Sequence, residues 1–322
     1  MVDTQYGGDR MSSSMDSVGQ AASEAGRSVH LLTDWPRRIL VASHGATSAT
    51  PAITAGRALA ERHDALLSVM TVYVPDVALP AVAERRGLAQ CEASERGEAE
   101  RLLMAVQRQC AGDVQIGAAQ LEVGNPVSRI VQSAEQSAAD LVLVGLGQPD
   151  PTYRRAGGRT PAYVARDLCV PLYAVAAGCE TPTRCVVAFP DGTLHRPTLR
   201  AAMATTRPGG SLWVALPAST AAERDGPDGA RDVPSDVVRE LAGDASRLRL
   251  AGVDRWSDVL AGVLRRAAAV QAELIVVPIS GLPGAVRSFL PSLAGALLLD
   301  AKCSVLVVPM EPSDETTPTR RQ

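Results

Sequence analysis

Residues 144–161 combine the residue types that proteins use to bind anions. Their sequence is VGLGQPDPTYRRAGGRTP, and their arginines are Arg154, Arg155 and Arg159. Glycines let backbone N–H groups approach an anion closely, and arginines donate charged hydrogen bonds that suit phosphate. Thr160 and Pro161 suit the first positions of a helix, whose N-terminus attracts negative charge. The stretch therefore predicts either an anion-binding loop or a solvent-exposed connector whose arginines face water.

Two more candidate side chains follow short apolar runs. His44 comes after ILVAS, and Asp191 comes after CVVAFP. The histidine can contact a ligand and titrate near neutral pH, or it can be a turn residue. Asp191 can accept a hydrogen bond from a ribose or an amine, or it can form the turn Pro-Asp-Gly-Thr. A functional and a structural interpretation stay open for both residues.

Known catalytic and metal-binding signatures are missing from the sequence. It contains no G-x-S-x-G, no G-x-x-x-x-G-K-[ST] and no H-E-x-x-H, so we expect no catalytic residue and a protein that is not an enzyme. The six cysteines form no C-x-x-C pair and the chain has four histidines, so we expect no metal site. We interpret the cysteines as small buried side chains of a protein in the reducing cytoplasm.

Composition excludes several classes of partner. The net charge is −3, the pI is about 5.9 and aromatic residues make up 3%, which disfavours nucleic acid and anionic membranes. The most apolar tract is interrupted by Asp300 and Lys302, so we expect no membrane-spanning segment, and the N-terminus has no secretory signal. Residues 1–36 and 311–322 are rich in Ser, Gly, Asp and Thr, so we expect disordered tails.

Two parts of the chain share one order of sequence signals. ADLVLVG matches AELIVVP, and VPLYAV matches CSVLVV, both at an offset of 133 residues. RRILVASHG matches TRCVVAFPDG, which we align at an offset of 147 residues. We therefore predict two domains, residues 37–177 and 184–310, joined by a short linker.

Short β-branched runs alternate with helical patterns in both parts. In the first part strands are predicted at 38–43, 66–73, 115–122, 141–145 and 171–176. Helices are predicted there at about 48–63, 90–110, 126–138 and 159–168. In the second part strands are predicted at 185–189, 211–216, 247–252, 274–278 and 304–309. Apolar strands alternating with helices indicate βαβ units and a parallel sheet, which binds ligands at the carboxyl ends of its strands.

This order of motifs resembles the universal stress protein family in its tandem two-domain form, over about residues 37–310. The motifs are ILVA, the segment Gly124-Asn125-Pro126, the run ADLVLVG, a glycine loop and a closing apolar strand. The resemblance implies an α/β fold of two tandem Rossmann-like (adenine nucleotide α-hydrolase-like) domains. Each domain would have a five-stranded parallel sheet with helices on both faces, and the two copies would associate through their last strands.

Nucleotide-binding members of that family bind ATP with an Asp after the first strand and a Gly-x2-Gly-x9-Gly-Ser/Thr loop. His44 stands at the Asp position of the first copy, and Asp191 is present in the second. The first-copy loop positions are Gly145, Gln148, Gly158 and Arg159. A one-residue slip instead uses Gly147, Gly157 and Gly158, with Val144 at the first position. The second-copy loop positions are Pro278, Gly281, Pro291 and Ser292.

Neither copy carries the complete motif. The candidate cofactor-binding residues are Gly145, Gly158, Arg159, Thr160, Asp191, Gly281 and Ser292. We expect no certain cofactor and weak ATP binding at best. The resemblance implies a non-enzymatic regulatory or interaction module in stress response, with degenerate ATP sites in both halves and a protein partner or a second copy of the chain. One alternative is an adenine-nucleotide sensor that uses a modified site in one half, and a third is a nucleotide-hydrolysing enzyme.

Overall fold

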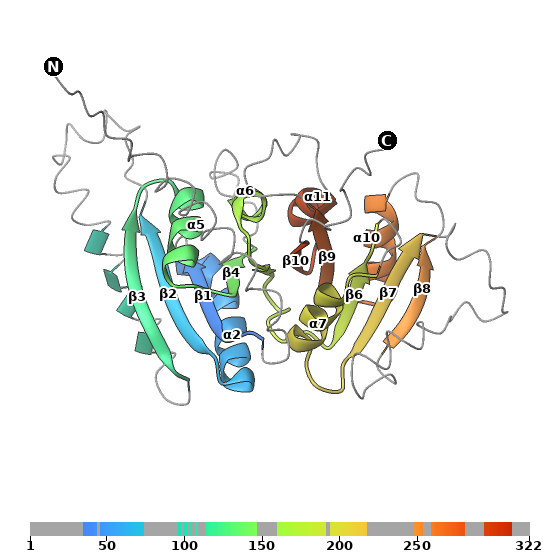
Figure 1. The fold of residues 1–322 in the computed structure, drawn as a ribbon, viewed down its shortest axis with the longest axis horizontal. Coiled ribbons are helices and arrows are strands. Elements are labelled where there is room, and N and C mark those ends of the chain that lie inside the picture. Colours follow the sequence, from blue (N-terminus) through green and yellow to red (C-terminus); the bar gives the residue numbers. More distant parts are fainter. Residues whose placement is uncertain are drawn as a thin grey trace, which may run out of the picture.

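The strands of the chain form one continuous sheet, and helices cover both of its faces (Figure 1). The structure is a computed structural model. It describes residues 35–43, 46–73, 96–97, 100–101, 103–104, 107–108, 114–146, 160–190, 194–217, 248–253, 259–280 and 293–310. The order of the strands in the sheet is β3-β2-β1-β4-β5-β10-β9-β6-β7-β8. The predicted α/β fold class is therefore confirmed.

The first five strands run parallel to one another. They are β1 (Arg38–Ser43), β2 (Leu66–Tyr73), β3 (Ile116–Val123), β4 (Leu141–Gly145) and β5 (Leu172–Val175). The helices that the structure describes from end to end in this half are α2 (Ala46–His63), α5 (Pro126–Gln136) and α6 (Thr160–Asp167). These bounds lie within two residues of the predicted ones, while most of the helix predicted at 90–110 lies outside the described residues.

The second half repeats this order of strands. Its strands are β6 (Arg184–Ala188), β7 (Ser211–Pro217), β8 (Leu248–Val253), β9 (Leu274–Ser280) and β10 (Ser304–Met310). Its helices are α7 (Arg196–Thr205), α10 (Val259–Ala269) and α11 (Leu293–Asp300). Each half is thus a five-stranded parallel arrangement in which the third strand lies at one edge and the fifth at the other.

Two hydrophobic clusters pack on opposite faces of the sheet, because successive strand residues point to opposite sides. The cluster under α2 and α7 contains Ile39 and Val41, and the cluster under α5, α6, α10 and α11 contains the intervening Leu40 and Ala42. Helix α2 approaches β1 closely at Gly56, where an added Cβ would lie 2.6 Å from Cγ2 of Val41. Burial on both faces explains why the strands are apolar throughout.

The halves join through their last strands, as the family resemblance implies. Strand β5 pairs antiparallel with β10, and Tyr173 lies opposite Leu306 at the centre of the pairing. These two residues are related by the offset of 133, so the join is nearly symmetric. Away from the sheet, Nη1 of Arg62 at the end of α2 donates to the carbonyl oxygens of Ala204, in the last turn of α7, and of Thr206, just after it, at 3.1 and 3.2 Å.

Strand registers correct one alignment made from the sequence. Ile39 of β1 lies beside Leu141 of β4, and Cys185 of β6 lies beside Leu274 of β9. Since Leu141 and Leu274 correspond at offset 133, Ile39 corresponds to Cys185, at an offset of 146 rather than 147. The alignment was wrong because it matched the turn after the strand instead of the strand itself.

Trp35, which is expected from the sequence to lie in the disordered N-terminal tail, is part of the fold. Its side chain is 6% exposed and packs in the cluster under α2. Its Nε1–H donates to the carbonyl oxygen of Asp140 at 2.8 Å. The remaining residues of both predicted tails, 1–34 and 311–322, lie outside the described part of the chain.

Candidate functional site

The carboxyl ends of β1 and β4 mark the switch point of the first half. These strands are neighbours, but the chain leaves β1 toward β2 on one side and leaves β4 toward β5 on the other. The same reversal separates β6 and β9 in the second half. Ligands of open parallel sheets bind at such points, because the diverging connections leave a crevice there. The predicted sites therefore belong at the ends of these four strands.

Two residues of the predicted first-half site lie on described elements. Gly145 is the last residue of β4 and pairs with Val175, and Thr160 is the first residue of α6 and is half-buried. The backbone N–H of Leu146 donates to the carbonyl oxygen of Val175 at 2.7 Å, so the fold itself uses this group. The strand end and the helix start are thus placed as predicted from the sequence.

The other predicted site residues lie outside the described part of the chain. They are His44, Gln148, Arg154, Arg155, Gly157, Gly158, Arg159, Asp191, Gly281, Pro291 and Ser292. Their proposed roles stay predictions from the sequence.

The second half differs at the first glycine position of the loop. Pro278 pairs with Val308 of β10, just as Gly145 pairs with Val175 of β5. Strand β9 then continues to Ser280, which pairs with Met310. Proline has no N–H to donate, and the residues after it belong to the strand pairing. This end of β9 is therefore part of the sheet where the family motif would begin its loop.

The segment Gly124-Asn125-Pro126 forms the start of α5 at the same edge. Oδ1 of Asn125 accepts hydrogen bonds from the backbone N–H groups of Val127 at 2.9 Å and Ser128 at 3.3 Å. Gly124 has φ of 127°, a conformation that other residues rarely adopt. The asparagine thus caps the helix and occupies donors that an anion would otherwise use.

A half-buried carboxylate fixes the opposite, amino ends of β1 and β4. Asp140 precedes β4, and its oxygens accept the backbone N–H groups of Arg37 and Arg38 at 2.8 and 3.0 Å. Burial raises the pKa of Asp140 above its ordinary value, although these hydrogen bonds act in the other direction. The run ADLVLVG is recognisable in the sequence, but nothing in the sequence indicates this role for its Asp.

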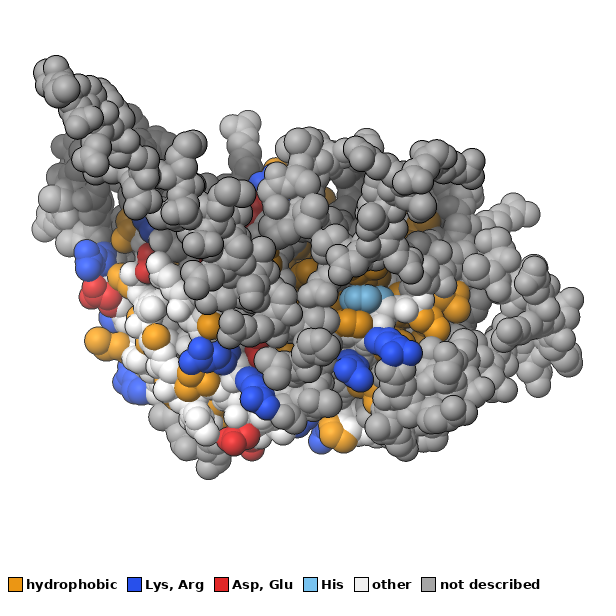
Figure 2. All heavy atoms as spheres, in the orientation of Figure 1, with side chains coloured by type: hydrophobic (Ala, Val, Ile, Leu, Met, Phe, Trp, Pro, Cys, Tyr) orange, Lys and Arg blue, Asp and Glu red, His pale blue; other side chains and the backbone are white. Residues whose placement is uncertain are grey.

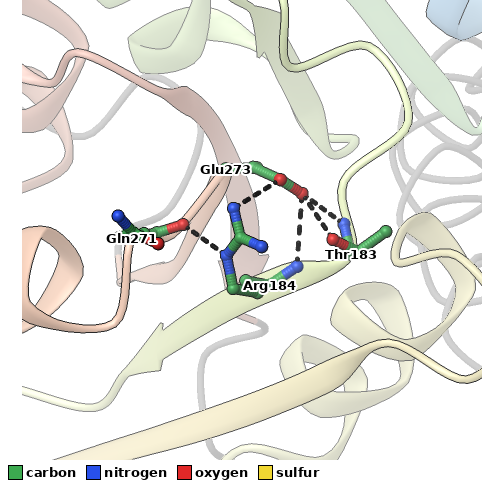
Figure 3. Close-up of polar contacts among 4 residues, drawn as sticks. All are labelled: Thr183, Arg184, Gln271 and Glu273. Carbon is green, nitrogen blue, oxygen red and sulfur yellow. Dashed lines mark hydrogen bonds and ion pairs between the residues drawn. The ribbon is translucent and has the colours of Figure 1, made fainter.

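Glu273 does the same in the second half, as Figure 3 shows. Its Oε2 accepts the backbone N–H of Thr183 at 2.6 Å and the hydroxyl of Thr183 at 2.9 Å. Its Oε1 lies 2.8 Å from Nη2 of Arg184, whose Nε donates to the carbonyl oxygen of Gln271 at 2.8 Å. Burial opposes ionisation, but the hydrogen bonds and the Arg184 guanidinium outweigh it and lower the pKa of Glu273.

The buried cysteines Cys185 and Cys303 have thiols that do not ionise readily. Burial raises the pKa of the Cys303 thiol to about 12 and raises that of Cys185 further, so both stay protonated near neutral pH. Cys169, in contrast with the prediction of burial, is exposed. Within the described ranges no three His, Cys, Asp or Glu side chains gather in a way that could hold a metal ion.

Charged side chains are spread over the visible surface. Figure 2 shows Lys and Arg side chains in several places on this face, with Asp and Glu side chains among them. No helix of the described segments is long and apolar enough to cross a bilayer.

Comparisons with known proteins agree with this architecture. Residues 36–176 match the model of the universal stress protein family. The fold is similar to that of a universal stress protein from Archaeoglobus fulgidus, with a TM-score of 0.62 and 15% identity over 86% of this chain and 98% of that chain. It is also similar to a putative universal stress protein from Pseudomonas aeruginosa, with a TM-score of 0.55 and 15% identity over 86% and 94% of the two chains. No curated protein sequence matches.

Proposed function

The chain belongs to the universal stress protein family through residues 36–176, and we propose that it acts in a stress response as a non-enzymatic regulatory or interaction module. We also propose that residues 184–310 are a second domain of the same family, because their strands repeat the order of the first half. The ligand of such a module is a protein partner or a second copy of the chain.

The observation that carries this proposal is the place of the two carboxylates with shifted pKa values. Groups with perturbed pKa values often mark catalytic sites when they lie in a cleft. Here Asp140 and Glu273 lie at the amino ends of the strands and accept backbone N–H groups. We therefore infer that the two carboxylates stabilise the fold. They lie at the opposite end of the strands from the switch points, where a ligand would bind.

Altered residues at the loop positions support degenerate ATP sites in both halves. Pro278 replaces the first loop glycine in the second half and lies within the strand pairing. Gln148 replaces the second glycine and Arg159 the hydroxyl residue in the first half, where His44 also stands in place of the Asp. Fewer backbone donors are then free to surround a triphosphate, so we expect weak ATP binding.

A nucleotide sensor that uses a modified first-half site is the second candidate. It is favoured by Gly145 and Thr160, which retain the strand end and the helix start on either side of the loop. The arginines Arg154, Arg155 and Arg159 would then replace lost backbone donors with charged ones. A nucleotide hydrolase is the third candidate and requires turnover in addition to binding.

Turnover of ATP by the purified full chain tests the non-enzymatic proposal. Phosphate release is measured over hours at millimolar ATP with Mg²⁺, beside an Arg159→Ala variant and a sample without protein. We expect all three to release phosphate at the same background rate. Release by the wild type that exceeds background and disappears in Arg159→Ala would establish hydrolysis and overturn the proposal.

A further inference from the structure

Three cysteines from distant parts of the sequence lie near one another where the two halves join. Cys179 belongs to the linker that follows β5, Cys185 lies on β6, and Cys303 immediately precedes β10. Burial is the main reason that the pKa of Cys303 is raised, and the nearby Cys179 thiol adds to the shift. Cys303 adds in the same way to the effect of burial on the pKa of Cys185. The three thiols are therefore electrostatic neighbours.

Hydrogen bonds hold the linker at Cys179 against the start of β10. The Ser304 hydroxyl donates to the carbonyl oxygen of Cys179 at 3.1 Å and accepts the backbone N–H of Ala176 at 3.0 Å. The hydroxyl of Tyr173 also donates to the carbonyl oxygen of Cys179, at 3.4 Å. Because Cys303 is the chain neighbour of Ser304, these contacts bring the backbones of Cys179 and Cys303 together. A disulfide needs such proximity, since it joins Cα atoms about 4 to 7 Å apart.

Cys179 and Cys303 also lie on one face of the sheet. Cys303 is 8% exposed and belongs to the hydrophobic cluster under α5, α6, α10 and α11, and the half-buried Cys179 packs against the same cluster. Cys185 is fully buried in the cluster on the other face. Cys179 and Cys303 are therefore the pair that a disulfide can join, and solutes reach this pair through Cys179.

We propose that peroxide converts Cys179 and Cys303 into a disulfide that covalently joins the linker to the start of β10. Both cysteines are free thiols in the structure, which therefore represents the reduced state. The bond would hold the end of the first half to the last strand of the second half. The inference goes beyond the proposed function, because it adds regulation by oxidation and depends on neither nucleotide loop.

The half-exposed Cys179 reacts first with hydrogen peroxide. Its sulfur bonds to one peroxide oxygen, the O–O bond breaks, and the thiol proton leaves with the other oxygen as water. The sulfur of Cys303 then attacks the resulting sulfenic acid, and the S–O bond breaks as the S–S bond forms. The hydroxyl group leaves with the Cys303 proton as a second water. Two thiols thus lose two electrons, and one peroxide is reduced to two waters.

This reaction is slow at neutral pH, since the thiolate is the nucleophile. Burial raises the pKa of Cys179 and, to about 12, that of Cys303. The pair therefore stays reduced during a brief exposure to peroxide and forms the disulfide under sustained exposure.

Peptide mapping by mass spectrometry tests the pairing. The purified full chain is incubated with hydrogen peroxide for hours, its remaining thiols are alkylated, and the peptides are compared with those of the reduced protein. We expect a disulfide between Cys179 and Cys303 that dithiothreitol reverses, and no such bond in Cys179→Ser or Cys303→Ala. Cys169→Ser changes an exposed cysteine outside the pair and should form the same disulfide as the wild type.

Urea denaturation tests whether the disulfide constrains the chain. The bond closes a loop that contains residues 180–302, nearly the whole second half, and such a loop restricts the unfolded chain. The oxidised wild type should therefore unfold at a higher urea concentration than the reduced wild type. Cys179→Ser, treated with peroxide in the same way, should show no such rise.

The inference is overturned if peroxide leaves Cys179 and Cys303 unpaired, or if it pairs either of them with another cysteine. A disulfide between the two that does not raise the urea midpoint above that of the reduced protein would also overturn it. These results do not depend on ATP, so failure of this inference and failure of the proposed function are distinguishable.

Discussion

Asp140 and Glu273 occupy corresponding positions of the two halves, and they accept hydrogen bonds from backbone N–H groups in the same way. Each carboxylate accepts backbone N–H groups at the start of the neighbouring strand, where a parallel pair would otherwise leave donors without partners. Their pKa values shift in opposite directions: burial dominates for Asp140 and raises its pKa, whereas for Glu273 the hydrogen bonds from Thr183 and the charge of Arg184 outweigh burial and lower it. These contacts join residues about 90 to 100 positions apart, which explains why the sequence gives no direct sign of them.

Removing the Glu273 carboxylate should destabilise the protein. Glu273→Ala leaves the N–H and hydroxyl of Thr183 without their acceptor, and we expect the free energy of unfolding to fall by about 1 to 2 kcal/mol. Glu273→Gln keeps an oxygen acceptor and should lose less. Urea denaturation at pH 7 measures both, with Glu135→Ala on the exposed side of α5 as the control. Equal losses for Glu273→Ala and Glu135→Ala would contradict the role assigned to Glu273.

The elements were largely predictable from the sequence, and the candidate site only in part. Runs such as LVLV are apolar without a break and bounded by turns. The predicted strand bounds therefore lie within two residues of those in the structure. The position of Gly145 and Thr160 followed from the same strand–loop–helix pattern. The predicted alignment of the first strands of the two halves, which ended at Asp191, was wrong by one residue. The register of a strand depends on its pairing with a strand distant in the sequence. The hydroxyl of Thr71, which is 3% exposed and has no hydrogen-bond partner among the described residues, could not be recognised from the sequence, since only packing distinguishes it from the hydroxyl of an ordinary strand threonine.

The contact of α2 with α7 should respond to pH. Nε2 of His63 lies 3.0 Å from the carbonyl oxygen of Ala204, and burial, aided by the charge of Arg62, lowers the pKa of His63. The folded state therefore binds the proton less tightly than the unfolded state, so stability present above pH 6.5 falls as the pH drops below it. Urea midpoints between pH 7.5 and 5.5 should decrease in the wild type and less in His63→Gln. Identical pH dependence in the two proteins would contradict this account.

At the scale of the whole molecule, the two halves share one sheet and both hydrophobic clusters. The sheet runs from β3 to β8 through the β5–β10 pairing, and both hydrophobic clusters contain residues from each half. Helices α6 and α11, which correspond to one another, also pack together on one face. A join that relates Tyr173 to Leu306 almost symmetrically resembles a dimer built into one chain.

Unfolding should accordingly proceed in a single transition. Trp35 reports on the first half, while Trp213 and Trp256 lie in the second half of the sequence. A Trp35→Phe variant and a Trp213→Phe, Trp256→Phe double variant each leave tryptophan fluorescence from one half. Because the halves share their cores, the two variants should have denaturant midpoints that coincide with their own far-UV circular dichroism. Fluorescence and dichroism that separate in either variant would show that the halves unfold independently.

The central claim, that neither half retains a working triphosphate site, is tested most directly by calorimetric titration of the full chain with ATP and Mg²⁺. Pro278 within the β9–β10 pairing and the changed loop residues Gln148 and Arg159 predict no saturable binding at micromolar ATP, and an affinity no higher than that of adenosine. Micromolar ATP binding that Arg159→Ala or Asp191→Ala abolishes would contradict the account and establish a nucleotide-binding stress protein in its place.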